Sequence, residues 1–247
     1  NDPVAFRMGG TGGAIQVNAA PTFSGTDTAE FRGTSVTVGA AIAMGSGNLT
    51  LRADTLALNA AVSGTGTIFI VPESSSTTMG IGASATGTLN VDATELGNIT
   101  NGWSLISLGE TTRTTEIDLN SETFTDPVSI QNAANNDIII GSGETINTTG
   151  SNKEITIHAG RELEIDGTVQ TVNSDIDLRG NDDGAGSALG STGGFRGVDV
   201  DTGTVTTVEG DITIIGHAGD TGGSQQGIRV NTNGTVSSTG TGSGAGT

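Results

Sequence analysis

The chain contains no cysteine and no tyrosine, and its 247 residues include a single tryptophan. Without cysteine there is no disulfide framework, so the stability of the fold has to come from backbone hydrogen bonds and packing. Aromatic residues make up 3 % of the chain, whereas a rounded globular core usually relies on them to fill its volume. A narrow core of stacked Ile, Val, Leu and Ala does not need large rings, and the shortage therefore favours an elongated fold.

Long apolar runs and helix signals are also scarce. No run is long enough to span a bilayer and no signal peptide is visible, so we expect no membrane insertion. Because the chain starts at Asn1 rather than Met, we expect a processed product or a segment of something longer. The best helix candidate, residues 92–97, is at most a single turn closed by Gly97. We therefore expect an all-β chain.

Basic residues are few. Nine of them stand against 27 acidic residues, which gives a net charge of −18. Such a surface repels nucleic acid and anionic membranes and attracts divalent cations. We therefore expect no nucleic-acid partner. The absence of cysteine also fits an exported bacterial protein, so we expect an extracellular or cell-surface location.

The chain does contain a sequence repeat, which occurs in three copies between Lys153 and Ser237. Each copy holds short segments in which apolar and polar residues alternate, the period of a half-buried strand. Gly, Asn, Asp and Thr separate these segments and supply turn conformations. One linker swells to residues 180–197 in the second copy and shrinks to 216–227 in the third. Strands that stay constant while one linker varies indicate stacked coils with a variable surface loop.

From Gly47 onwards the coils measure about 20 residues, which fits a parallel β-helix with three short strands per coil. We expect irregular N-terminal coils or a cap in residues 1–46 and one continuous β-helix in residues 47–247. About 12 coils would make a rod about 55 Å long. A β-sandwich has equally short strands but explains neither the coil length nor the equivalent positions. The coil-start residues expected to stack in one column are Ile117, Ile138, Ile155, Ile176 and Ile212.

Several segments, taken together and not singly, resemble those of a known protein family. They are residues 64–70, 80–82, 87–91, 95–96 and 103–109, followed by the glycine-rich repeats at 210–214 and 234–236. Together they resemble a recurrent segment of filamentous-haemagglutinin-like giant bacterial surface adhesins, over residues 47–247. The resemblance implies secretion, a right-handed parallel β-helix and a structural or adhesive role.

A set of acidic residues precedes the coil-start isoleucines, and alternation should point them outward, one above another. Two unit charges about 4.8 Å apart in water repel by roughly 0.9 kcal/mol. Ca²⁺, which takes oxygen ligands, would relieve this repulsion by bridging neighbours. The alternative is that the carboxylates splay into water, because the glycine-aspartate nonapeptide of calcium-binding β-rolls is missing. The candidate ligands are Glu116, Asp137, Glu154, Asp175 and Asp211, together with Asp182 and Asp183 in the long loop.

The two swollen linkers are candidate binding loops, because loops on a rigid scaffold commonly carry recognition. The candidate residues are Asn181, Asp182, Asp183 and Asp220. A solvated, flexible loop is the alternative. Both linkers fall at the same angular position, so we expect them to form one face. On a neighbouring strand we expect Arg229 to pair with Asp199 as an exposed ion pair.

Catalytic signals are weak. Parallel β-helices do host polysaccharide lyases and hydrolases that use clustered carboxylates, Lys and Arg, but this chain has one lysine, Lys153. His158 and His217 follow strands two coils apart, with no Ser or Cys nucleophile pattern beside them. Trp103 is better explained as a core or cap residue than as a sugar platform. We therefore expect no catalytic residues and no enzyme, and keep a polysaccharide-processing enzyme as the alternative.

The remaining signals concern partners. The tail after Ser237 offers no bulky cap, so we expect end-to-end stacking into filaments or onto neighbouring β-helix segments. Cell-surface or matrix glycans are the other expected partners. Four sequons mark possible glycosylation sites in a secretory context, at Asn48, Asn98, Asn147 and Asn233. The overall expectation is a secreted structural or adhesive rod.

Overall fold

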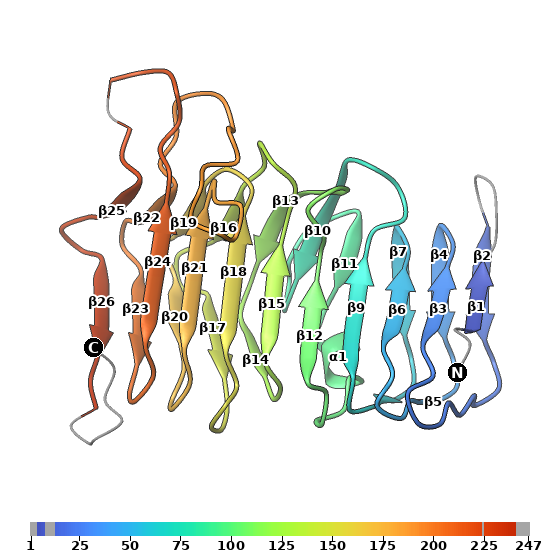
Figure 1. The fold of residues 1–247 in the computed structure, drawn as a ribbon. Coiled ribbons are helices and arrows are strands. Elements are labelled where there is room, and N and C mark those ends of the chain that lie inside the picture. Colours follow the sequence, from blue (N-terminus) through green and yellow to red (C-terminus); the bar gives the residue numbers. More distant parts are fainter. Residues whose placement is uncertain (1–3, 8–12, 224, 241–247) are drawn as a thin grey trace.

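The computed structural model describes residues 4–7, 13–223 and 225–240. In these residues the chain forms 26 short strands and one short helix (Figure 1). The longest sheet, sheet A, has nine strands in the order β1 (Val4–Arg7), β3 (Ala29–Arg32), β6 (Leu49–Arg52), β9 (Thr67–Val71), β12 (Leu105–Leu108), β15 (Val128–Gln131), β18 (Ile155–Ala159), β21 (Ile176–Gly180) and β24 (Ile212–Gly216).

Four further sheets flank sheet A. Sheet B has the order β2 (Ala14–Val17), β4 (Ser35–Val38) and β7 (Thr55–Leu58), and sheet C pairs β5 (Ile42–Ala43) with β8 (Val62–Ser63). Sheet D has the order β11 (Leu89–Val91), β10 (Thr77–Ile81), β13 (Thr114–Leu119), β16 (Ile138–Ile140), β19 (Leu163–Ile165), β22 (Val198–Val200) and β25 (Ile228–Val230). Sheet E has the order β14 (Glu122–Phe124), β17 (Thr145–Thr148), β20 (Thr168–Gln170), β23 (Thr204–Thr207) and β26 (Thr235–Ser238).

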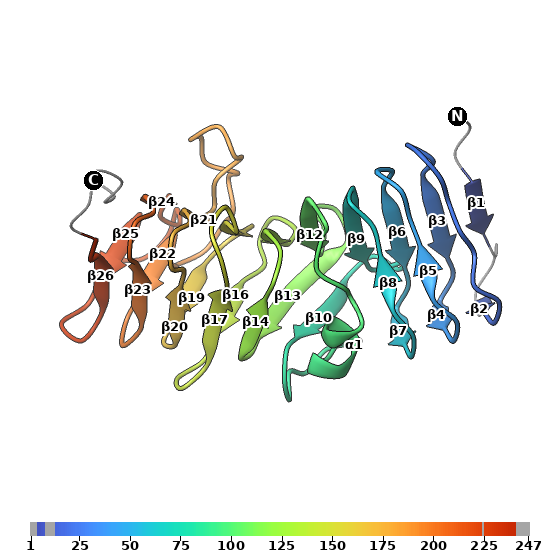
Figure 2. The ribbon, with the colours of Figure 1, turned by 90° about the horizontal axis from the view of Figure 1, so that it is seen from below.

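The strands within each of these sheets run parallel. Parallel pairing excludes the β-sandwich alternative, whose sheets are antiparallel. β1 and β24 lie at opposite ends of the stack in both views (Figures 1 and 2). The eight steps between the nine strands of sheet A, at about 4.8 Å each, make the sheet about 38 Å long. The structure has fewer coils than the 12 expected, because residues 72–104, 181–197 and 217–227 add no strand to sheet A.

The three copies read from the sequence are confirmed. The first copy supplies β18, β19 and β20, the second β21, β22 and β23, and the third β24, β25 and β26. Each copy therefore gives one strand to sheet A, one to sheet D and one to sheet E. Alternation places one side of every strand inward, and Ile155, Ile176 and Leu178 are at most 1 % exposed. Burying each such side chain contributes about 1.5–3 kcal/mol.

The prediction that the five coil-start isoleucines stack in a single column is wrong. Ile155 pairs with Ile176, and Ile176 with Ile212, in sheet A. Ile117 pairs with Ile138 in sheet D instead. The interval from residue 138 to residue 155 covers only the passage from sheet D back to sheet A, and this 17-residue interval has nearly the length of a full repeat. Ile138 and Ile155 therefore have matching sequence patterns but belong to different sheets.

Residues 13–46 carry the same repeat as the residues that follow, because β3, β4 and β5 pair with β6, β7 and β8. The least regular stretch is residues 72–104, which holds the one-turn helix α1 (Ala93–Gly97). Asp92 caps this helix, and its side chain accepts hydrogen bonds from Thr94 N and Glu95 N. Trp103 is 1 % exposed, as expected for a core residue. Within the described residues, no helix has the length and apolar character needed to cross a bilayer.

Candidate functional site

Two loops project beyond the ends of β21 and β24 at one edge of the stack (Figure 1). We call residues 181–197 the long loop and residues 217–227 the second loop. Glycines stand at their stems because the backbones approach closely there. A Cβ on Gly180 would lie 1.7 Å from the Gly197 carbonyl oxygen, and one on Gly216 would lie 2.1 Å from that of Gly227. The repeat can therefore open into a loop and close again without separating the strands.

The long loop folds back over earlier repeats. Ser191 Oγ donates to the Gly160 carbonyl at 2.5 Å and accepts from Asn135 N at 2.9 Å. Asn135 Oδ1 in turn accepts from Thr192 N at 2.9 Å. At the stem, Asn181 is 1 % exposed and its Oδ1 accepts from Ser191 N. Residues 183–190 are exposed, in line with the solvated-loop alternative, whereas Asn181, Asp182 and Ser191 are buried.

The two loops pack against each other, which confirms the shared face expected from the sequence. Gly219 N donates to the Phe195 carbonyl at 3.2 Å. Gly193 N donates to Asp220 Oδ1 at 2.9 Å. Asp220, a candidate binding residue, therefore ties the second loop to the long loop.

A cluster of charged and titratable side chains lies beneath the long loop. Arg179 Nε donates to both oxygens of Asp177 at 3.0 Å, and its Nη1 donates to Asp182 Oδ1 at 3.0 Å. His217 Nε2 lies 3.1 Å from Asp182 Oδ2. His158 Nε2 lies 3.5 Å from Asp177 Oδ2, at the outer limit of a hydrogen bond. We call these five residues the loop cluster, and it links the two histidines through two aspartates and one arginine.

Electrostatics keep the aspartates of the loop cluster ionised. The Asp182 side chain is 0 % exposed. Burial raises its pKa, but the hydrogen bonds from Arg179, Gly184 N and His217 outweigh burial, so the pKa of Asp182 lies below its ordinary value. Burial likewise raises the pKa of Asp177, and the His158 and Arg179 interactions lower it further than burial raises it. The hydrogen bonds to both aspartates raise the pKa of Arg179. Asp177, Asp182 and Arg179 are therefore charged at neutral pH.

A hollow of about 330 Å³ lies between the long loop and the ends of β15 and β18. Its volume is at the lower end of the range for small-molecule sites. The floor comes from sheet A, the roof from the long loop and one wall from the turn that follows β12. The lining residues are Thr111, Gln131, Asn132, Ala134, His158, Ala159, Gly160, Asp182, Asp183, Gly184 and Leu189.

The predicted acidic column divides between two sheets for the same reason as the isoleucines. Glu154, Asp175 and Asp211 follow one another on the outer side of sheet A and line a hollow of about 290 Å³. Glu116 and Asp137 lie on sheet D, where Arg161 Nε donates to Asp137 Oδ1 at 2.7 Å. The residues described by the structure contain no group of three or more His, Asp or Glu side chains arranged to hold a metal ion. Calcium binding stays a prediction.

Sequence reasoning missed Glu162, which continues the acidic column on sheet D. Burial is the main cause that raises its pKa to about 7, and the Asp137 charge adds to it.

The predicted ion pair between Arg229 and Asp199 is confirmed in part. Arg229 donates to Asp199 at 2.7 and 2.6 Å, as predicted, but Asp199 is 4 % exposed and the pair is not a surface pair.

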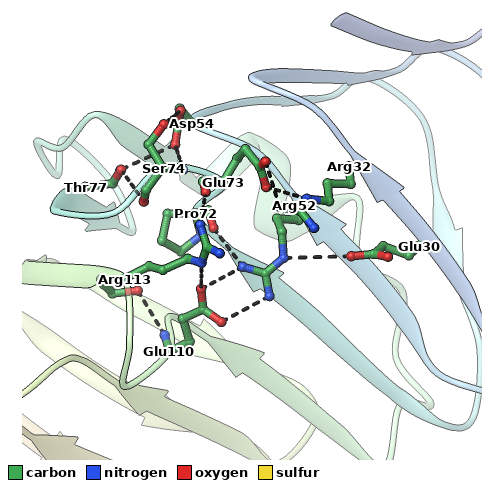
Figure 3. A network of polar contacts seen from close by, with 11 residues as sticks. Glu30, Arg32, Arg52, Asp54, Pro72, Glu73, Ser74, Thr77, Glu110 and Arg113 are labelled. Carbon is green, nitrogen blue, oxygen red and sulfur yellow. Dashed lines mark hydrogen bonds and ion pairs between the residues drawn. The ribbon is translucent and has the colours of Figure 1, made fainter. Parts of the chain in front are cut away.

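A second charged cluster, the arginine–glutamate network, covers the outer side of sheet A at β3 and β6 (Figure 3). Arg32 Nε lies 2.8 Å from Glu73, and Arg52 Nη1 lies 2.7 Å from Glu110. Arg52 also reaches Glu30 at 3.8 Å. Arg113, the sixth member, lies 3.4 Å from Glu110. The network joins two strands to the loops that follow β9 and β12.

The four sequons lie on different parts of the surface. Asn48 and Asn233 are exposed, whereas Asn98 and Asn147 are partly buried. Two of these side chains support the fold, since Asn48 Oδ1 accepts from Thr67 N and Asn98 Nδ2 donates to the Leu58 carbonyl. Glycosylation stays a prediction at all four.

Comparisons with protein-family models, with curated proteins and with solved structures found no match for this chain. The resemblance to filamentous-haemagglutinin-like adhesins therefore stays a prediction.

Proposed function

We propose that the chain is a segment of a secreted bacterial structural or adhesive protein, built as a right-handed parallel β-helix and located outside the cell or on its surface. Its role is mechanical and not catalytic. The parallel ladders of sheets A, D and E support this proposal, because each repeat hydrogen-bonds to the next along the axis and resists being pulled apart. The rod would hold the long loop and the second loop away from the cell, where they can meet partners.

The observation that carries the proposal is the apolar surface at the β24–β26 end. Ile228, Val230 and Val236 are 44, 48 and 38 % exposed. Their register partners one repeat earlier are Val198, Val200 and Val205, each of which is 0 % exposed. Within the described residues, these last core-facing side chains thus lack the next layer.

An open strand edge next to apolar side chains is a template for further strands. We propose that this surface takes a further β-helix layer that continues the ladders, either from a neighbouring β-helix segment or from the β1 end of a second copy of the chain. Because β1 and β24 lie at opposite ends of sheet A, such stacking is head to tail and builds a filament.

Sedimentation velocity over a range of concentrations tests this proposal. We expect concentration-dependent growth of the native chain and a shift toward monomer for Val230→Lys, which places a charge in the apolar end. Val172→Lys is the matched control, because Val172 is 47 % exposed and lies in the turn after β20, away from the end. A native chain that stays strictly monomeric, or equal loss of assembly in both variants, would contradict stacking.

A polysaccharide-processing enzyme is the second candidate. The observation that favours it is the hollow on the outer side of sheet A, which is lined by four carboxylates and an arginine: Glu154, Asp175, Asp177, Asp211 and Arg179. Converging carboxylates and arginine are the groups that β-helical lyases and hydrolases use. Release of reducing ends or of unsaturated products from a panel of polysaccharides, abolished by Asp177→Asn, would favour this candidate. No release from the native chain would count against it.

A further inference from the structure

We propose that the hollow beneath the long loop binds an uncharged sugar unit. This inference names a ligand class for the adhesive role and rests on the proposed function. The hollow lies at the ends of β15 and β18, far along the chain from the apolar end at β25 and β26. Ligand binding and filament assembly can therefore be tested with different variants.

The first argument is that the walls are held in place before any ligand arrives. The roof is pinned to the floor by Ser191, which bonds Gly160 and Asn135 from two different repeats. On the other side, Asp182 is fixed by Arg179 and His217. A preformed hollow loses little conformational entropy on binding, which reduces one of the costs of association.

The second argument is that several polar groups in the walls are left over for a ligand. Asn132 is used by the fold, because its Nδ2 bonds the carbonyls of Thr115 and Asp137 and its Oδ1 accepts from Gly160 N. By contrast, the structure assigns no hydrogen bond within the described residues to the Gln131 amide or the Thr111 hydroxyl. Together they offer donors and acceptors, which is what vicinal sugar hydroxyls require.

Two further polar groups complete the wall. Asp183 Oδ1 accepts from Ala185 N and Ser187 N. These bonds leave the second oxygen of the Asp183 carboxylate available as an acceptor. The His158 ring lines the hollow as well. Its Nε2 is buried and lies 3.5 Å from Asp177 Oδ2, so the ring would meet a ligand through its other, exposed atoms.

The third argument is the apolar part of the lining. Leu189, whose backbone N–H donates to the Asn181 carbonyl near the stem of the long loop, is 41 % exposed, and Ala134 lines the hollow as well. An exposed leucine on a rigid loop can cover the C–H face of a sugar ring while the polar groups bond its hydroxyls. Mostly apolar walls with a few placed polar groups are typical of small-molecule sites.

The fourth argument is charge, and it selects the kind of sugar. The lining holds two carboxylates, Asp182 and Asp183, and no Lys or Arg. The whole chain adds a net charge of −18. Uronic acids and sulfated sugars would be repelled by this field, whereas an uncharged ring meets no such penalty. The site therefore fits neutral glycans.

Proton NMR of the imidazole rings provides a direct test, because the chain has only two histidines and only His158 lines the hollow. The probes are maltotriose, cellotriose and the trimer of N-acetylglucosamine, each titrated into the full chain, with trigalacturonate as the anionic comparator. We expect at least one neutral trimer to shift the His158 signals in a saturable way, with a Kd on the order of 1 mM. The His217 signals should move less, and trigalacturonate should give no saturable shift.

Variants then place the binding in the hollow. Gln131→Ala and Leu189→Ala should each weaken binding about tenfold, since each removes one polar or apolar contact. Thr213→Ala is the matched control, because Thr213 is exposed on the same sheet outside the hollow, and it should leave binding unchanged. The inference is overturned if no neutral trimer shifts His158, if only trigalacturonate binds, or if Gln131→Ala and Thr213→Ala bind alike. Filament assembly, measured with Val230→Lys, reports separately on the proposed function.

Discussion

Two charged clusters lie on the outer side of sheet A, and they differ in charge balance. The arginine–glutamate network (Figure 3) has three arginines and three glutamates, and Arg52 and Arg32 each bond one carboxylate through two nitrogens. The loop cluster has two aspartates, one arginine and two histidines. Its single permanent cation, Arg179, is shared between Asp177 and Asp182. The first cluster has equal numbers of positive and negative side chains, whereas in the second the buried Asp182 carboxylate also contacts His217 and the Gly184 N–H.

The packing around the two clusters differs in the same way. In the network, loops close over the sheet and bury Val71 and Pro72. Around the loop cluster, the long loop stands off the sheet and leaves the hollow of about 330 Å³. Within the described residues, the network therefore joins strands and loops without leaving a hollow between them, whereas the loop cluster borders an open hollow.

Arg179→Met is expected to have the largest effect. It leaves the Asp182 carboxylate, which is 0 % exposed, with only His217 and Gly184 N as partners. Removing one partner of a buried ion pair costs about 3–5 kcal/mol. Urea unfolding should show this loss, and limited proteolysis should cut within residues 183–190 faster than in the native chain. A loss below about 1 kcal/mol, typical of surface pairs, would remove the distinction between the clusters.

Arg52→Met is expected to cost less, about 1–3 kcal/mol, because the Arg52 and Glu110 side chains remain 17 and 19 % exposed to water. Arg32→Met is its matched control in the same network. The Arg32 side chain is 34 % exposed, so this change should cost about 0–1 kcal/mol. Urea midpoints of the two variants provide the measurement. A greater loss from Arg32→Met than from Arg52→Met would show that burial does not set the strength of this network.

Glu162 makes a smaller, pH-dependent contribution. Its pKa is about 7 in the folded chain, against an ordinary value of 4.5. The folded state therefore holds the proton more tightly, and stability falls as the pH rises from about 4.5 through about 7. Glu162→Gln, which carries no charge, should raise the melting temperature at pH 8 and flatten the profile across this window. A variant with the native pH profile would rule out this role for Glu162.

Calcium binding is expected to have the smallest effect. Glu154 and Asp175 are both exposed on the outer side of sheet A, so a bridging cation would add little stability. If Ca²⁺ bridges them, calcium should raise the melting temperature of the native chain slightly, and Glu154→Gln with Asp175→Asn should abolish the rise. A calcium-dependent rise that persists in the double variant would end this hypothesis.

Much of the fold could be predicted from the sequence, because alternation and repetition are local signals. The strands at Ile155, Ile176 and Ile212 recur with the same neighbours, and the structure pairs them. The assignment of Ile117 and Ile138 to the same column failed because linker lengths vary. A short passage between two sheets then has the length of a whole repeat.

The candidate site was less predictable. The two loops and their shared face were visible as insertions of variable length. The connection between His158 and His217 was not visible, because it runs through Asp177, Arg179 and the buried Asp182. The loop that carries Asp182 is held by the contact between Ser191 and Asn135, which lie 56 positions apart in the sequence and belong to no periodic pattern. The register that places His158 beside Arg179 was the one available signal.

The stacking of successive repeats is tested most directly by a distance between spin labels, which the absence of native cysteine makes simple to introduce. Thr50 and Thr213 occupy the same outward column of sheet A, six strands apart in the ladder from β6 to β24. Labels at Thr50→Cys and Thr213→Cys should give one narrow distance distribution near 29 Å, six steps of about 4.8 Å. A broad distribution, or a main distance well away from this value, would contradict the ladder.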